Sequence, residues 1–166
     1  MATDLCCEYV LDLSTDLKMN EGGGGDTPTA TTIRPTSIRG LDGKPIRRTI
    51  WPQGASNGAI LGTGRFGGRL IAVEGEIIVV SGGELVTPAD NLTTYLTGVN
   101  TLVKAWTDGL EAVLNTAFNF VFTPTGLSQV TLSVVYGFEG AEFQSVPSPD
   151  MSEPVKVSYG LVAASG

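Results

Sequence analysis

The chain has 166 residues and a formal net charge of −7, with 42% hydrophobic and 16% charged residues. This length supports one domain over residues 1–166 and is too short for two. The low charged fraction predicts either a surface that is buried in an assembly or a β-rich domain with Thr, Ser and Asn on its faces. No apolar run approaches the roughly 20 residues of a membrane span, which argues against membrane insertion.

The chain has no histidine, and its two cysteines, Cys6 and Cys7, are adjacent. Neighbouring cysteines rarely pair, because the disulfide geometry is strained. Without histidine they cannot complete a zinc site, and Ser-His-Asp or Cys-His catalysis is impossible. We therefore expect reduced thiols in a cytosolic product, no catalytic residue, no metal and no cofactor. The start "MATDLCCEYVLDL" carries acids rather than bases, so no secretory signal is expected.

Basic residues concentrate in one stretch, 34–69, which holds seven of the ten against a single acid and has a net charge of +6, whereas the rest of the chain carries −13. A basic patch could bind nucleic acid, but no aromatic residues alternate with these arginines to stack on bases. The alternative is that the stretch forms salt links with the acidic part of a neighbouring subunit. That interpretation is preferred.

The first strand is expected over 8–14, where Tyr9, Leu11 and Leu13 share one face. A flexible glycine-rich loop over 15–35 follows and includes the run Gly22 to Gly25. This loop is either a surface loop or an arm that becomes ordered on a neighbour.

Residues 36–51 predict a β-hairpin, because Asp42-Gly43 is typical of a tight turn. The glycine-rich segment 52–68 is expected to be a loop or an extended ribbon. The strongest strand follows over 69–80, and Gly75 at its centre indicates a bulge or a close backbone approach.

The segment "GTGRFGGR" (62–69) fits the G-x-G-x-x-G pattern of dinucleotide-binding loops. That site needs a helix after the glycines, because the pyrophosphate sits on the helix N-terminus. Here a strand follows instead, and we reject a nucleotide site.

One main helix is predicted over 87–107, with Thr87 as its N-cap, Pro88 in the first turn and Asp90 completing a capping box. Its apolar stripe runs from Leu92 to Trp106, and residues 110–114 either continue it or form a second short helix. Strands are then expected over 118–122 and 130–136, joined by a turn, with a last strand after the Pro-rich loop 146–154. Six or seven strands and one packed helix predict a mainly β protein, a β-sandwich with a helix on it.

Carboxylates offer two weak candidates for chemistry. Glu74 and Glu76 lie two apart on one strand face, where a solvated surface explains them better than catalysis. Acids over 139–153 could bind a cation but lack the residue order of a calcium loop. These acids are Glu139, Glu142, Asp150 and Glu153.

The segments "SIRGLDGKPIRR", "PQGASNGAILGTGRFGGRLIAVEGEII" and "PADNLTTYL", in this order, resemble the first domain of the distal tail proteins of long-tailed bacteriophages. The similarity is clearest over 36–109, and the ending "VSYGLVAAS" resembles the strand that closes that domain. The matching positions are Gly40, Leu41, Gly43, Gly58, Gly68, Arg69, Ile71, Glu74 and Gly75.

The resemblance implies a tail-tube-like, ring-forming domain in the virion, at the tail tip, made in the cytoplasm of the bacterial host. Many members of that family add a second, carbohydrate-module-like domain, which we do not expect in residues 1–166. The resemblance also implies a homohexamer between the tail tube protein and the tail-tip hub or fibre proteins, with the tape measure protein as a further neighbour and DNA passing through the channel. Six arginines are the expected subunit or partner interface, and Arg65 and Arg69 are expected to bridge subunits. They are Arg34, Arg39, Arg47, Arg48, Arg65 and Arg69.

Two alternatives stay open. The major tail tube protein resembles the same ring but stacks into filaments. A sugar-binding β-sandwich module would need exposed aromatic residues, for which Trp51 or Tyr136 could serve.

Overall fold

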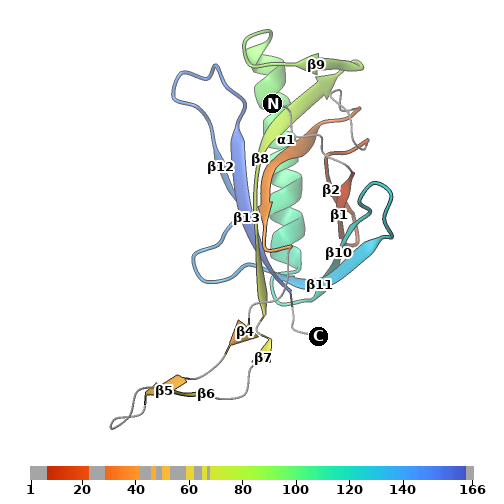
Figure 1. The fold of residues 1–166 in the computed structure, drawn as a ribbon. Coiled ribbons are helices and arrows are strands. Elements are labelled where there is room, and N and C mark those ends of the chain that lie inside the picture. Colours follow the sequence, from red (N-terminus) through yellow and green to blue (C-terminus); the bar gives the residue numbers. More distant parts are fainter. Residues whose placement is uncertain are drawn as a thin grey trace.

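The computed structural model describes residues 7–22, 29–41, 46–47, 50–52, 59–61, 65–66 and 68–163 (Figure 1). It is mainly β with one long helix. In chain order the elements are β1 (Tyr9–Asp12), β2 (Leu17–Met19), β3 (Thr32–Arg39), β4 (Ile46–Arg47), β5 (Ile50–Pro52), β6 (Ala59–Leu61), β7 (Arg65–Phe66), β8 (Arg69–Ser81), β9 (Glu84–Val86), α1 (Leu92–Ala112), β10 (Phe118–Phe122), β11 (Val130–Tyr136), β12 (Gln144–Val146) and β13 (Lys156–Ala163).

The main sheet closes on itself as a seven-stranded barrel. Its strands follow the order β10-β1-β2-β3-β8-β13-β11, and β11 pairs with β10 to complete the circle. The expected sandwich is therefore wrong in architecture, although the mainly β class with one packed helix is confirmed. A sandwich and a barrel bury alternate residues of each strand in the same way, so the alternation alone does not distinguish them.

Strand β8 is central to the barrel, because it pairs with β3 on one edge and with β13 on the other. Its odd-numbered residues are buried from Ile71 to Val79, as the alternation predicts. The close approach expected at Gly75 is confirmed: a Cβ there would lie 2.7 Å from the carbonyl oxygen of Arg34. The β3–β8 register shifts beside this point, between Pro35 and Ser37.

The hairpin expected across Asp42-Gly43 is wrong. Strand β3 pairs with β8, β4 pairs with β7 and β5 pairs with β6, all antiparallel and nested one inside the next. Asp42 and Gly43 themselves lie outside the described residues. Part of the expected extended ribbon is confirmed in β6 and β7. We call the segment 42–67, which contains β4 to β7, the arm; it leads away from the barrel at the end opposite β9 (Figure 1).

Strand β12 continues β11 along the same edge of β13. Residues Val134 to Tyr136 pair with the end of β13, and Gln144 to Val146 pair with its beginning. The excursion between them folds over β13, where a Cβ on Gly160 would lie 2.2 Å from the Phe138 ring. Among the described strands, β12 pairs only with β13.

Helix α1 begins later than expected. Asn91 is the N-cap, since its side chain accepts a hydrogen bond from the backbone N–H of Thr94 at 3.1 Å. Thr87 instead accepts a hydrogen bond from the Asp90 N–H in a turn that precedes the helix. The helix runs past Gly109 to Ala112, so the continuation is confirmed over the second short helix.

The helix runs along the long strands and shares their core (Figure 1). Gly98 and Gly109 allow this contact, because a Cβ there would lie 2.6 Å from Val79 and 3.0 Å from Leu17. The largest buried side chain, Trp106, contacts the rings of Tyr159 and Phe143. Barrel and helix therefore form one hydrophobic core.

The segment 15–35 is not a continuous loop. It contains β2 and the start of β3, while residues 23–28 lie outside the described part of the chain. Met19 and Ile33 pair as the single parallel contact between β2 and β3, and both are fully buried. The glycine run concealed these short strands from the sequence pattern.

Candidate functional site

The structure separates the six expected interface arginines into two groups. Arg34 and Arg39 lie on β3 and Arg69 begins β8, so these three belong to the barrel. Arg47 and Arg65 lie on β4 and β7 in the arm, and Arg48 lies outside the described residues. The expected arginines in the described residues are therefore divided between the barrel and the arm.

Arg39 has a partner within its own subunit. Its Nη2 lies 3.4 Å from Oε1 of Glu74, and both side chains are mostly exposed, at 70% and 55%. An exposed pair of this kind contributes at most about 1 kcal/mol, so either side chain can exchange it for a partner in another molecule. Glu74 is thus a surface residue on the outer face of β8, as expected.

Arg69 lies at the start of β8, next to the arm, and its side chain contacts its own subunit. Its Nη1 donates to the carbonyl oxygen of Leu41 at 3.1 Å, and its Nε is buried. Gly40, one residue before Leu41, has φ of +90°, and a Cβ there would lie 1.9 Å from the carbonyl oxygen of Leu70. Gly40 and Arg69 thus fix the end of β3 and the start of β8, where these strands adjoin the arm. Gly68 is less constrained, with the Ala163 carbonyl 3.5 Å from a Cβ, and Gly43 lies outside the described residues.

Arg47 and Arg65 occupy directly opposed positions in the β4–β7 pair. Like charges at opposed positions of an antiparallel pair destabilise it. The segment 42–67 as a whole has four basic residues and one acid, whereas the rest of the chain has six basic and sixteen acidic residues. A basic arm on an acidic body is the charge pattern that an acidic partner would stabilise.

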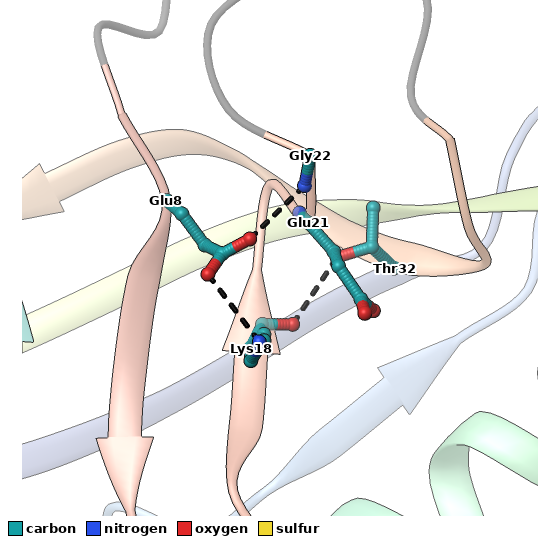
Figure 2. Close-up of polar contacts among 5 residues, drawn as sticks. All are labelled: Glu8, Lys18, Glu21, Gly22 and Thr32. Carbon is teal, nitrogen blue, oxygen red and sulfur yellow. Dashed lines mark hydrogen bonds and ion pairs between the residues drawn. The ribbon is translucent and has the colours of Figure 1, made fainter.

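A polar cluster fixes both sides of the segment 23–28 (Figure 2). Glu8 accepts a hydrogen bond from the Gly22 N–H at 3.0 Å and pairs with the Lys18 ammonium at 3.6 Å. Thr32 donates to the carbonyl of Lys18 and accepts from the N–H of Glu21, at 3.1 and 3.2 Å. No motif signals this cluster, because its residues come from β2, from the start of β3, and from the chain before β1 and after β2.

The base of the segment is also held by Asn20. This residue adopts a left-handed backbone with φ of +53° and is 4% exposed. Its side chain donates to the carbonyl of Cys7 at 2.9 Å, and its backbone N–H donates to Ile33. Buried polar contacts of Asn20 therefore fix the chain at the end of β2, before the glycine-rich segment.

A hollow of about 500 Å³ crosses the outer face of four strands, β3, β8, β13 and β12. Sequence reasoning missed it, because its residues come from distant segments. Its charged residues are Glu74, Glu76 and Lys156, and Arg39 offsets Glu74, so the hollow has no strong net charge. Val146 is 59% exposed at its β12 side. The lining residues are Thr36, Glu74, Gly75, Glu76, Gln144, Val146, Lys156, Val157 and Ser158.

The remaining sequence candidates are the four acids over 139–153 that could bind a cation. No group of three or more Cys, Asp or Glu residues suitable for a metal occurs in the described part of the chain. Asp150 accepts hydrogen bonds from Ser148 and Ser152 in a tight turn, and those from Ser152 are the main cause of its lowered pKa. Glu139, Glu142 and Glu153 join no such group.

The two aromatic candidates for sugar stacking are not both available. Tyr136 is half-buried, and its hydroxyl accepts a hydrogen bond from the Phe143 N–H at 2.7 Å. Burial raises the pKa of this hydroxyl. Trp51 lies in β5 of the arm.

In the described residues, no helix has the length and apolar character needed to cross a membrane.

The chain was compared with protein families and with curated proteins. The chain matches no protein-family model, and no curated protein matches it.

Proposed function

We propose that this chain is a structural protein that forms a homohexameric ring at the tail tip of a long-tailed bacteriophage. In this role it joins the tail tube protein to the hub or fibre proteins, borders on the tape measure protein, and leaves a central channel for DNA. The proposal takes its specific content from the resemblance over 36–109. It gives the protein no catalytic role.

The observation that carries the proposal is the nested arm. Strands β4 to β7 pair only with one another among the described strands. A two-stranded ribbon is marginally stable in water by itself, so a chain that retains one gains from covering it with another molecule. The opposed Arg47 and Arg65 make an acidic partner favourable, and another copy of the same acidic body provides one.

A closed ring is the simplest assembly that uses such an arm. The arm and the surface that receives it are different parts of the subunit, so the contact is head-to-tail. Head-to-tail contacts generate rings when the rotation closes, and filaments when it does not. This distinction also separates the distal tail protein from the tail tube alternative.

The test is negative-stain electron microscopy of the purified protein together with its mass from light scattering. Closed six-fold rings that do not stack support the proposal, whereas long stacked tubes indicate the tail tube protein. A 17.3 kDa monomer at every concentration, alone and with tail tube protein, overturns both.

A paired substitution tests the arm. Arg47→Glu with Arg65→Glu should abolish ring formation, because the arm then repels the acidic body. The control Lys18→Glu with Lys104→Glu changes the charge equally but outside the arm and the hollow, where Lys18 pairs with Glu8 at 3.6 Å and Lys104 pairs with Asp108 at 2.6 Å. If both variants form rings equally well, the arm is not the contact.

A further inference from the structure

Several strand edges lack a partner among the described strands: those of β12 and β9 at the two ends of the main sheet, and those of the arm strands β4 to β7. Two of these strands, β12 and β6, match in length. β12 (Gln144–Val146) is an exposed three-residue edge strand beside the hollow. β6 (Ala59–Leu61) is a three-residue strand of the arm that pairs only with β5. Open strand edges present unpaired N–H and C=O groups that accept another strand.

We infer that β6 of one copy adds to the edge of β12 of a second copy, so that β12 and the adjoining hollow are the receiving surface for the arm. This inference rests on the proposed ring and names the surfaces that would build it. The partner is a second copy of this chain. At β6 the contact is backbone pairing with apolar cover, and the basic residues elsewhere in the arm add attraction to the acidic body.

The choice of β6 over β5 follows from the backbone. Strand β5 ends in Pro52, which has no N–H to donate, and proline is typical of a protected edge. Strand β6 contains no proline and is apolar throughout, with Ala59, Ile60 and Leu61.

The choice of β12 follows from its surroundings. Val146 is 59% exposed although it lies in a strand, and Pro147 directly after it limits the free edge to three residues. The hollow of about 500 Å³ adjoins β12 on the outer face of the barrel, over β13 and β8. The nearly balanced charges of the hollow suit an apolar strand better than a basic one.

The contact has to be between molecules. Strands β5 and β6 lie beyond the barrel, at the end opposite β9 and away from β12 of the same subunit (Figure 1). Within the subunit, β12 pairs only with β13 among the described strands.

The test places a photo-cross-linking amino acid at Val146 in the full chain, with Leu127 as the control position. Leu127 is 69% exposed in the turn before β11, away from the hollow. Isotope-labelled and unlabelled protein are mixed, so that cross-links between copies carry a hybrid mass. We expect the cross-linker at Val146 to attach to residues 46–66 of another copy, and the one at Leu127 not to.

A matched pair of substitutions supplies the second readout. Val146→Asp and Ile60→Asp should each raise the protein concentration needed for rings by about tenfold or more, because each puts a charge into the strand contact. Leu127→Asp should leave it unchanged, and thermal unfolding checks that each monomer is folded. Wild-type rings with no cross-link to the arm and no effect of Val146→Asp overturn this inference and leave the proposed ring intact. Absence of any rings removes both.

Discussion

Two regions of the molecule differ in how they are stabilised: the barrel together with its helix, and the arm. In the barrel, strands from distant parts of the chain share one core with α1, and its largest side chains are fully buried. In the arm, strands of two or three residues pair only with one another among the described strands. The contrast predicts that the barrel can fold by itself, whereas in the proposed ring the arm gains its stability from the neighbouring copy. Substitutions should therefore affect folding in the first region and assembly in the second.

The largest effect is expected from the shared core. Trp106→Ala removes a side chain that is 1% exposed and contacts the rings of Tyr159 and Phe143. The cavity and lost burial should lower the free energy of unfolding by about 3–5 kcal/mol. Urea titration measures this, with Leu127→Ala as the exposed control. A loss below 1 kcal/mol would contradict the packing of α1 on the barrel.

The root of the arm should come next. Gly40→Ala places a Cβ 1.9 Å from the Leu70 carbonyl at a φ of +90°, whereas Gly82→Ala has a φ of +62° and open space around the Cβ. The second change costs only the left-handed backbone, about 1–2 kcal/mol. The first adds a backbone clash and should cost more. Thermal unfolding of the two variants compares them, and equal losses would show that the chain relaxes at Gly40.

The hydroxyl of Tyr95 links the helix to β8 and to the residue that precedes β13. It donates to the carbonyl of Ile77 and accepts from the N–H of Val155, each at 2.8 Å. Tyr95→Phe leaves both backbone groups without this partner and should cost about 1–3 kcal/mol. Chemical denaturation at pH 7 measures the loss, and an unchanged stability would mean that water replaces the hydroxyl.

The same residue contributes to a pH dependence. Burial raises the pKa of Tyr95, Tyr136 and, most strongly, Tyr159. In the unfolded chain these phenols ionise near pH 10.0, before they do in the folded protein. The stability they provide is therefore complete below pH 10 and is lost as the pH rises above it. Tyr95→Phe should make this decline shallower in unfolding curves recorded between pH 9 and pH 11.

The helix start should show a smaller effect. Asn91→Ala removes the cap on the Thr94 N–H and should cost about 1 kcal/mol. Thr87→Ala should cost less, because Thr87 accepts only in the preceding turn. If the order is reversed, the helix begins at Thr87 in solution.

The smallest effect on folding is expected in the arm. Arg47→Glu with Arg65→Glu should change the melting temperature of the monomer little, because these positions lie outside the barrel and surface substitutions are usually within about 0.5 kcal/mol. The same variant should abolish rings. A large loss of monomer stability would show that the arm is part of the folding unit.

The sequence predicted elements better than their partners. The alternation of β8 from Ile71 to Val79 and the apolar stripe of α1 from Tyr95 to Trp106 are confirmed, because side-chain period follows directly from local geometry. The hairpin at Asp42-Gly43 was wrong because that local turn signal competes with the long antiparallel pairing of β3 with β8. The helix cap was misplaced for a related reason: Thr87 and Asn91 both suit a cap, and only the observed hydrogen bonds decide between them.

The candidate site was predicted only in composition. A basic arm on an acidic body follows from counting charges along the chain. The contact of Arg69 with Leu41, the cluster around Glu8 and the hollow beside β12 each bring together residues from distant parts of the chain. No spacing in the sequence indicates these contacts.

By itself, the sequence determined that this is a mainly β protein with one amphipathic helix, an uneven charge distribution and no histidine for catalysis. These properties depend on residue types and on periods of two and 3.6 residues, which are local. Only the tertiary structure decided that the sheet closes into a barrel, that β3 pairs with β8 and that β12 keeps an open edge. Those outcomes depend on which strands meet across long stretches of chain, and strand pairing is specified by the whole set of packed faces rather than by any one segment.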